Sequence, residues 1–222
     1  MRSSHLRSSA LFLAALLSGC ASQSPDRMAA APIAAASDHA NAYQRLPAAN
    51  ARYRDGDPNA RAEPRLNPEV DQHAALVARA AQGPSVSAED LARQGYLLSL
   101  RGDRDGAIAT LDEARTRFPD NGRVYWTLGW VWLNLDEPAA ALAAWQEAER
   151  IHGGRPAWVP YSKAIALIAL NDEEAALAWW QVARRTLPYQ LGSAKRALRT
   201  FSYWRPKERA LLERLIALAY PD

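Results

Sequence analysis

The chain lacks most of the side chains on which enzyme and metal chemistry depend. Its 222 residues include a single cysteine, Cys20, and only four histidines. One thiol cannot form an intramolecular disulfide, and the histidines show no HExxH or other metal-ligand spacing. The sequence also contains no glycine-rich phosphate loop and no nucleophile elbow. We therefore expect no enzymatic activity, no catalytic residue, no metal and no cofactor.

An excess of charge of one sign is also missing. The 27 basic and 24 acidic residues leave a formal net charge of +3. This excess is too small to indicate nucleic-acid binding, and we expect neither a nucleic-acid partner nor a small-molecule substrate. Hydrophobic residues make up 49% of the chain, and many of them are alanines, which favours helices.

The N-terminus has the layout of a secretory signal. Arg2 and Arg7 precede the short apolar run ALFLAALL, and LSGC follows at residues 17–20. This stretch resembles the lipobox of bacterial lipoproteins, which implies cleavage after residue 19 and a lipid anchor, palmitate included, on Cys20. In a Gram-negative host, Ala21 resembles the signal for transfer to the periplasmic face of the outer membrane. The alternative is a plain signal peptide, which would leave an unpaired thiol in an oxidising compartment.

Residues 20–65 are rich in Ala, Pro, Asn, Asp and Arg and have few large apolar side chains. Such a composition buries too little apolar surface to fold alone, so we expect a flexible tether. The alternative is an extended segment that docks on the folded domain through Tyr43, Leu46 and Tyr53. The spacing of the apolar residues in 66–85 predicts a short amphipathic helix that ends at Gly83 and Pro84.

Beyond Val86 the sequence repeats with a period close to 34 residues. Ala107, Ala141 and Ala176 are 34 and 35 residues apart, and three more alanines, at positions 114, 148 and 183, repeat these intervals. The middle unit contains Tyr125, Leu128, Gly129, Trp132, Ala141 and Trp145. The first unit has Leu91, Gln94, Gly95, Leu98, Ala107, Leu111 and Pro119 at matching positions, and the third has Pro160, Lys163, Ala164, Leu167, Ala176, Trp180 and Pro188.

This pattern resembles the tetratricopeptide repeat over residues 86–190. The resemblance implies an all-α fold, namely a right-handed α-solenoid of about three helix pairs at about 88–121, 122–155 and 157–190. Residues 191–222 predict helices that cap the open end. The stretch GGRPAWVP, residues 153–160, departs from the pattern because it inserts one residue and places two prolines where a helix should begin.

Three tryptophans fall within seven positions of the segment RVYWTLGWVWLNL, residues 123–135. The repeat pattern turns Tyr125 and Trp132 toward the paired helix, whereas Trp126 and Trp130 project from an adjacent stripe. In the family this stripe lines a concave groove. The predicted groove consists of Tyr96, Leu100, Trp126, Trp130, Trp158, Tyr161 and Ile165. It suits an apolar segment of another protein, and the alternative occupant is a helix of the chain itself.

The charges are distributed unevenly along the chain. Residues 86–149 contain eleven acids and six bases, whereas residues 184–214 contain nine bases and two acids. We predict a basic patch of Lys195, Arg196, Arg199, Arg205, Lys207 and Arg209 that meets anionic head groups, lipopolysaccharide phosphates or an acidic partner. The alternative is a solvated face without a binding role.

Two hypotheses of function follow. The first is a lipid-anchored adaptor whose groove holds another envelope protein, as in the tetratricopeptide lipoproteins that help to build pili, secretins or outer-membrane complexes. The second is a structural or regulatory tether whose basic cap binds surface anions or a cell-wall enzyme, while the groove is filled by the protein itself.

Overall fold

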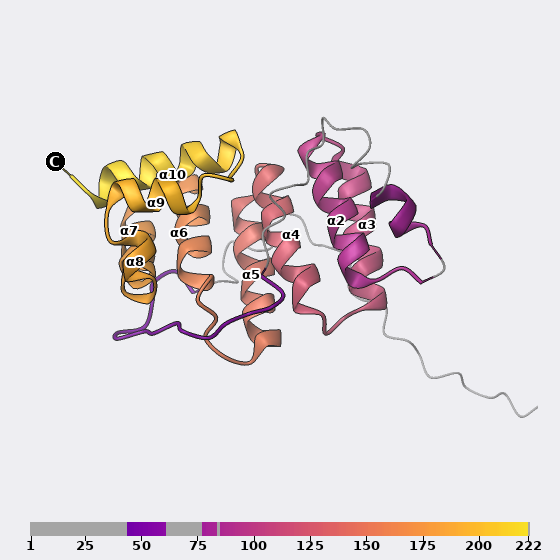
Figure 1. Ribbon diagram of the computed structural model, residues 1–222, viewed down its shortest axis with the longest axis horizontal. Coiled ribbons are helices and arrows are strands. Elements are labelled where there is room, and N and C mark those ends of the chain that lie inside the picture. The colour runs from indigo at the N-terminus through magenta and orange to yellow at the C-terminus, as the bar shows by residue number, and fades with distance from the viewer. Residues whose placement is uncertain (1–43, 61–76, 84, 222) are drawn as a thin grey trace, which may run out of the picture.

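The computed structural model describes residues 44–60, 77–83 and 85–221 (Figure 1). This part of the chain is helical, its helices pack against their neighbours, and it contains no β-strand, so the all-α class is confirmed. The predicted signal peptide and Cys20 lie outside the described residues, as does most of the helix predicted over 66–85, of which residues 77–81 are helical. None of the described helices is long and apolar enough to span a membrane.

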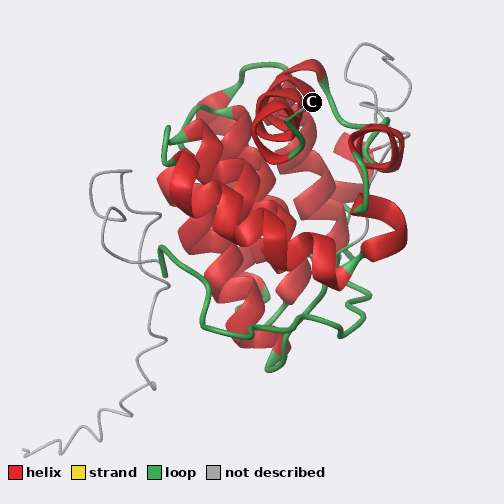
Figure 2. Cartoon of the chain, turned by 90° about the vertical axis from the view of Figure 1, so that its left-hand side faces the viewer, coloured by secondary structure: helices red, strands yellow, loops and turns green. Residues whose placement is uncertain are grey.

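The helices follow one another with short connections. They are α2 (Ala88–Leu100), α3 (Arg104–Arg117), α4 (Gly122–Asn134), α5 (Pro138–His152), α6 (Val159–Ala169), α7 (Glu173–Thr186), α8 (Pro188–Leu191), α9 (Ala194–Thr200) and α10 (Pro206–Ala219). Helix α2 packs on α3, α4 on α5 and α6 on α7. Helix α2 also packs on α4, and α5 on α6, so that each pair meets the next. The helices form the body of the molecule and most of the loops lie at its edges (Figure 2).

The ends of these helices follow from local sequence. Ser87 accepts a hydrogen bond from the backbone N–H of Asp90, and the Asp90 carboxylate accepts one in return, which gives α2 a capping box. Within each pair, the turn contains one residue with a left-handed backbone, namely Gly102 (φ 77°), Asp136 (φ 63°) or Asn171 (φ 61°). Glycine, asparagine and aspartate adopt this conformation at the least cost. The three turns are therefore built alike, at the same 34- and 35-residue intervals as the alanines.

Close helix contact within the second pair depends on the absence of a side chain at Gly129. A Cβ atom added there would lie 2.1 Å from Nε1 of Trp145, whose ring therefore occupies the space over α4. The same indole N–H donates a 3.1 Å hydrogen bond to the carbonyl oxygen of Trp126. Trp145 and Trp132 are buried as predicted, whereas Tyr125, predicted to be core, is half-buried with the Arg115 guanidinium 5.9 Å from its ring centroid.

Residues 44–60, which we expected to be part of a flexible tether, lie against the helices instead. We call this segment the strap. Tyr53 is buried at its centre, and its ring contacts Trp179 at a centroid distance of 5.9 Å. Leu46 remains 41% exposed, so the predicted docking through Tyr53 holds and that through Leu46 does not. Tyr43 lies outside the described residues.

Hydrogen bonds and ion pairs hold both halves of the strap. Arg45 pairs with Asp172 at 2.6 Å and with Glu174 at 2.7 Å, and the hydrogen bond from Arg45 lowers the pKa of Asp172. The backbone N–H of Asp55 donates to the carbonyl oxygen of Arg155, and the carbonyl oxygen of Asp55 accepts from the N–H of Ala157, on either side of Pro156. The Trp158 indole donates to the carboxylate of Asp57 at 2.9 Å. The strap thus covers the irregular junction between the second and third helix pairs.

The C-terminal helices cover the third helix pair, α6 and α7. Helix α10 packs across α6 and α7, and α9 packs on α8 and α10 (Figure 1). Between α9 and α10, residues 201–205 turn back toward α4, where the ring centroids of Trp204 and Trp130 are 5.4 Å apart. Lys207 then bonds the carbonyl oxygen of Asn134 at 2.9 Å and pairs with Asp136 at 2.6 Å.

Substitution of Gly129 by alanine should destabilise the protein. The new methyl group would collide with the buried Trp145 ring, and overpacking of this kind costs about 1–3 kcal/mol. We expect thermal or urea denaturation to show a lower free energy of unfolding for Gly129→Ala. The control is Gly56→Ala, because no atom lies within 4 Å of a Cβ added at Gly56. Equal stability of the two variants would contradict the packing that we describe.

Candidate functional site

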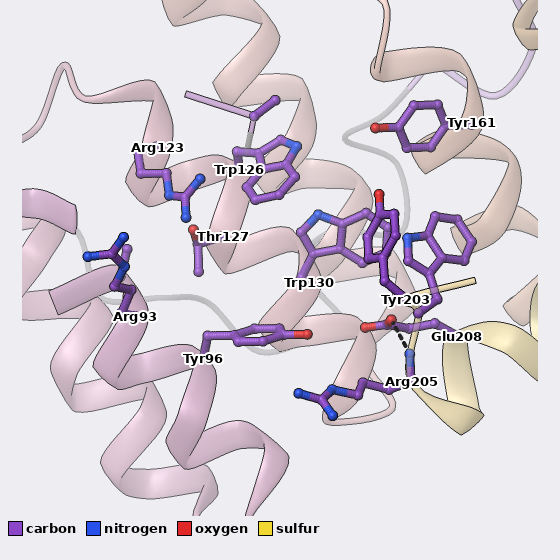
Figure 3. Close-up of a pocket in the computed structure, with 13 residues that line it drawn as sticks. Arg93, Tyr96, Arg123, Trp126, Thr127, Trp130, Tyr161, Tyr203, Arg205 and Glu208 are labelled. Carbon is purple, nitrogen blue, oxygen red and sulfur yellow. Dashed lines mark hydrogen bonds between the residues drawn. The ribbon is translucent and has the colours of Figure 1, made fainter. Parts of the chain in front are cut away.

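A solvent-open pocket lies where α2, α4 and α6 meet the C-terminal segment (Figure 3). Ala60, at the end of the strap, also lines it. The volume that the centres of water molecules can reach is about 60 Å³. One water needs roughly 10–15 Å³ of such volume, so the pocket has room for a single side chain or a small molecule, and not for a whole helix.

Aromatic rings form nearly half of the pocket lining, six of its thirteen residues. Trp130 is the central ring, with centroid distances of 6.0 Å to Trp126 and 5.0 Å to Trp145, both in edge-to-face geometry. On its other side lies Trp204, which stacks on Phe201 at 4.1 Å. Such aromatic contacts add to the burial of apolar area and hold each ring in one orientation. The wall is therefore rigid.

The structure brings together four of the seven predicted groove residues. Tyr96, Trp126, Trp130 and Tyr161 line the pocket. The other three do not line it: Leu100 is half-buried, Ile165 is fully buried, and Trp158 is buried with its indole bonded to the strap.

The predicted open groove is in fact partly covered by the chain itself. Trp126 and Trp130 are only 7% and 6% exposed. Phe201 and Trp204 lie against Tyr161 and Trp130, with ring centroids 5.0 Å and 5.4 Å apart. The turn between α9 and α10 thus fills the α6 side of the groove, where our alternative of a self-filled groove expected a helix, and the α2–α4 side stays open as the pocket.

Six lining residues with polar groups were not among the predicted groove residues, although one of them, Arg205, was predicted as part of the basic patch. They are Arg93, Arg123, Thr127, Tyr203, Arg205 and Glu208. A signal existed for two of them, because positions 123, 126, 127 and 130 share one face of a helix at spacings of three, four and seven. No such signal existed for Tyr203, Arg205 and Glu208, whose position depends on how the C-terminal segment folds back.

Three polar groups on this face of α4 are buried and have no hydrogen-bond partner among the described residues. They are Nε1 of Trp126, Oγ1 of Thr127 and Nε1 of Trp130. Buried polar atoms are nearly always hydrogen-bonded, to protein or to water. In Figure 3 the indole nitrogen of Trp130 and the hydroxyl groups of Tyr161 and Tyr203 point toward the space beside Trp126. Water or a ligand in the pocket has to supply the missing acceptors.

Positive charge surrounds these groups. The guanidinium of Arg123 is buried 5.2 Å from the centroid of the Trp126 ring, and its Nη1 donates a 3.0 Å hydrogen bond to the carbonyl oxygen of Asn59. Arg93 pairs with Glu89 at 2.8 Å on α2, and Arg205 lies at the start of α10. Three arginines therefore line a pocket that contains one carboxylate.

That carboxylate, Glu208, is in an unusual environment. It is 3% exposed and accepts a 3.0 Å hydrogen bond from the backbone N–H of Arg205. Burial disfavours its charged form and raises its pKa to about 7, although the Arg205 hydrogen bond and charge oppose this shift. Its carboxylate faces the hydroxyl group of Tyr96 across the pocket (Figure 3), and burial and the charge of Glu208 raise the pKa of that hydroxyl.

The predicted basic patch divides into two parts. Lys195, Arg196 and Arg199 are exposed on α9, and their side chains form no ion pair with the described part of the chain. Lys207 pairs with Asp136, Arg209 pairs with Glu213 at 3.0 Å, and Arg205 lines the pocket. The basic surface is therefore smaller than the sequence indicated.

Over residues 44–60, 77–83 and 85–221, no three His, Cys, Asp or Glu side chains are grouped so that they could hold a metal ion. Comparison with known proteins gives no match: no family model, no curated protein and no solved structure matches this chain.

Stability should decrease between about pH 5 and pH 8 because of Glu208. Its pKa in the folded protein lies above the ordinary value of 4.5, so its stabilising contribution is complete below 4.5 and is lost as the pH rises through 7. The loss is about 3 kcal/mol. Glu208→Gln should remove this pH dependence and be more stable than wild type at pH 8, as measured by urea denaturation across pH. Glu213→Gln, an exposed position on the same helix, should keep the wild-type profile; an unchanged profile in Glu208→Gln would contradict this role.

Proposed function

We propose that this protein is a lipid-anchored tetratricopeptide-repeat scaffold of the bacterial outer membrane that binds another envelope protein from the periplasmic side. In this proposal α2–α3, α4–α5 and α6–α7 are three repeats of a right-handed solenoid, and α8–α10 form its cap. The like-built turns at Gly102, Asp136 and Asn171 support the repeat assignment. The anchor is Cys20, and the partner belongs to an assembly such as a pilus, a secretin or another outer-membrane complex.

The observation that carries this proposal is the aromatic pocket on the α2–α4 face. It is open to solvent, its wall is rigid, and it is sized for one inserted side chain. Interfaces between proteins are commonly anchored by one residue that fills such a pocket, surrounded by contacts that exclude water. Tyr203 at its rim is 42% exposed and supplies amphipathic contact area beside the opening.

The covered α6 side of the groove supports a partner position on the α2–α4 side. Because Phe201 and Trp204 occupy that side, the partner contacts α2, α4 and the rim formed by residues 203–205. We propose that it enters as an extended segment or a loop, since a whole helix does not fit the pocket.

Site-specific photo-crosslinking in living cells tests the adaptor. A photoreactive phenylalanine derivative at Tyr203 should capture a distinct envelope protein, because this position borders the pocket. The control is the same probe at Tyr189, which is 84% exposed on α8 and does not line the pocket. The absence of any crosslinked partner from Tyr203, or the same products from both positions, would overturn the proposal.

A second function is favoured by the exposed cations of α9. Lys195, Arg196 and Arg199 are not neutralised by ion pairs within the described residues, and each basic side chain near an anionic lipid surface contributes about 1 kcal/mol of binding. This surface suits anionic head groups, lipopolysaccharide phosphates or an acidic cell-wall enzyme, with the scaffold acting as a structural or regulatory tether.

Replacing Lys195, Arg196 and Arg199 with glutamine should weaken binding to vesicles that contain phosphatidylglycerol by roughly a hundredfold, because about 3 kcal/mol of attraction is lost. Vesicle sedimentation measures the effect. The matched control replaces Arg101, Arg104 and Arg117, which removes the same charge from the first helix pair. Equal weakening in both variants would show a general charge effect and would argue against a specific surface.

A further inference from the structure

The polar groups on α4 that lack partners are concentrated at one place. Trp126, Thr127 and Trp130 lie on the same face of the helix, and all three line the pocket. An indole N–H only donates hydrogen bonds, so two of these groups require an acceptor. A buried donor without an acceptor destabilises the folded protein, and three such groups around a single pocket indicate what normally fills it.

We propose that this pocket is a binding site for a carboxylate group attached to a small apolar body. The carboxylate accepts hydrogen bonds from the indole N–H groups of Trp126 and Trp130. Carboxylate oxygens accept several hydrogen bonds at once, and such charge-assisted bonds are shorter and stronger than neutral ones.

The charges around the pocket favour an anion over a cation. Arg93, Arg123 and Arg205 line it, against the single carboxylate of Glu208. Arg123 is buried next to Trp126, where its charge is screened less than at the surface. The Glu208 carboxylate already accepts the backbone N–H of Arg205. An ammonium ion would meet three guanidinium groups and would leave the indole donors without acceptors.

The rest of the pocket selects the apolar body. Edges and faces of Trp126, Trp130 and Trp204 form its wall, and an aromatic or aliphatic group against them gains contact that a hydrated inorganic anion does not. The reachable volume of about 60 Å³ limits the ligand to roughly the size of one large side chain.

Two sources carry this chemistry. One is a free organic acid with an apolar group. The other is the C-terminal residue of a polypeptide, whose free carboxylate would be bound; this second source rests on the proposed adaptor function, whereas the first does not.

Binding of matched probes to the full-length purified protein tests the proposal. Phenylacetate, phenylacetamide and phenethylamine share one aromatic body and differ in charge, and inorganic phosphate is an anion without that body. We expect phenylacetate to bind at least about tenfold more tightly than the other three, as measured by isothermal titration calorimetry and tryptophan fluorescence. Binding of phenethylamine or phosphate as tightly as phenylacetate, or no binding of any probe, would overturn the proposal.

Single-atom changes separate a binding role from a structural one. Replacement of Trp130 with benzothienylalanine exchanges the indole N–H for a sulfur atom and keeps the shape of the ring, so it should weaken phenylacetate binding about tenfold. The melting temperature of this variant without ligand should stay the same or rise, because a buried donor without a partner is removed. The same replacement at Trp180, a residue of α7 that does not line the pocket, should leave binding unchanged. Unchanged affinity in the Trp130 variant would overturn the proposal.

Two peptides distinguish the sources. Acetyl-Ala-Ala-Phe with a free carboxylate and the same peptide with a C-terminal amide differ only at the group that we expect to be bound. Tighter binding of the free acid than of the amide supports a polypeptide C-terminus, and binding of phenylacetate with no binding of either peptide supports a free organic acid. Crosslinking from Tyr203 reports on the adaptor independently, so failure of one proposal is distinguishable from failure of the other.

Discussion

The arrangement of this protein depends on one contact, the Trp145 ring over Gly129. The missing side chain lets α5 approach α4, and the indole N–H of Trp145 then bonds the carbonyl oxygen of Trp126. Trp130 rests edge-to-face on Trp145, and Trp204 rests on Trp130. Each ring is positioned by the one beneath it, so the pocket wall is an extension of the core of the second helix pair. Its rigidity follows from that continuity.

A second constraint fastens the strap and the third pair to this framework. Lys163 is buried, pairs with Glu149 at 2.9 Å and lies 4.5 Å from the ring centroid of Trp179. Tyr53 of the strap covers the same site. Burial raises the pKa of its hydroxyl, and the nearby charge of Glu149 raises it further. A buried ion pair adds little net stability over apolar packing, but removing one partner leaves a buried charge and is costly. The pair therefore favours one arrangement of α5, α6 and the strap.

The helices could be predicted from the sequence because their signals are local and periodic. The alanine intervals and the caps at Ser87 and Asp172 lie within or between short segments, where sequence spacing determines which side chains share a face. Docking of the strap was only the alternative to a flexible tether, because residues 44–60 contain few large apolar side chains and are held by contacts with residues far along the chain. Glu208 was missed for the same reason, since its burial depends on the return of residues 201–205 to α4. Trp126 and Trp130 could be assigned from the sequence to the correct stripe of α4. The rings that cover them could not be identified in this way.

The buried polar atoms without a hydrogen-bond partner in the described structure include single ones at Ser162 and Trp180 and a group of three at the pocket. The N-terminal caps of α2 and α3 and the Trp145 indole have hydrogen-bond partners close by. At the pocket, by contrast, Glu208 contributes a buried carboxyl group, and Trp126, Thr127 and Trp130 contribute three polar groups without partners. Natural sequences are locally consistent except where function requires otherwise. A purely structural pocket would be more stable with valine, which has the same shape and no hydroxyl group, at position 127. Because these polar groups weaken the fold, their presence at a single solvent-open pocket is explained most directly by a ligand that uses them.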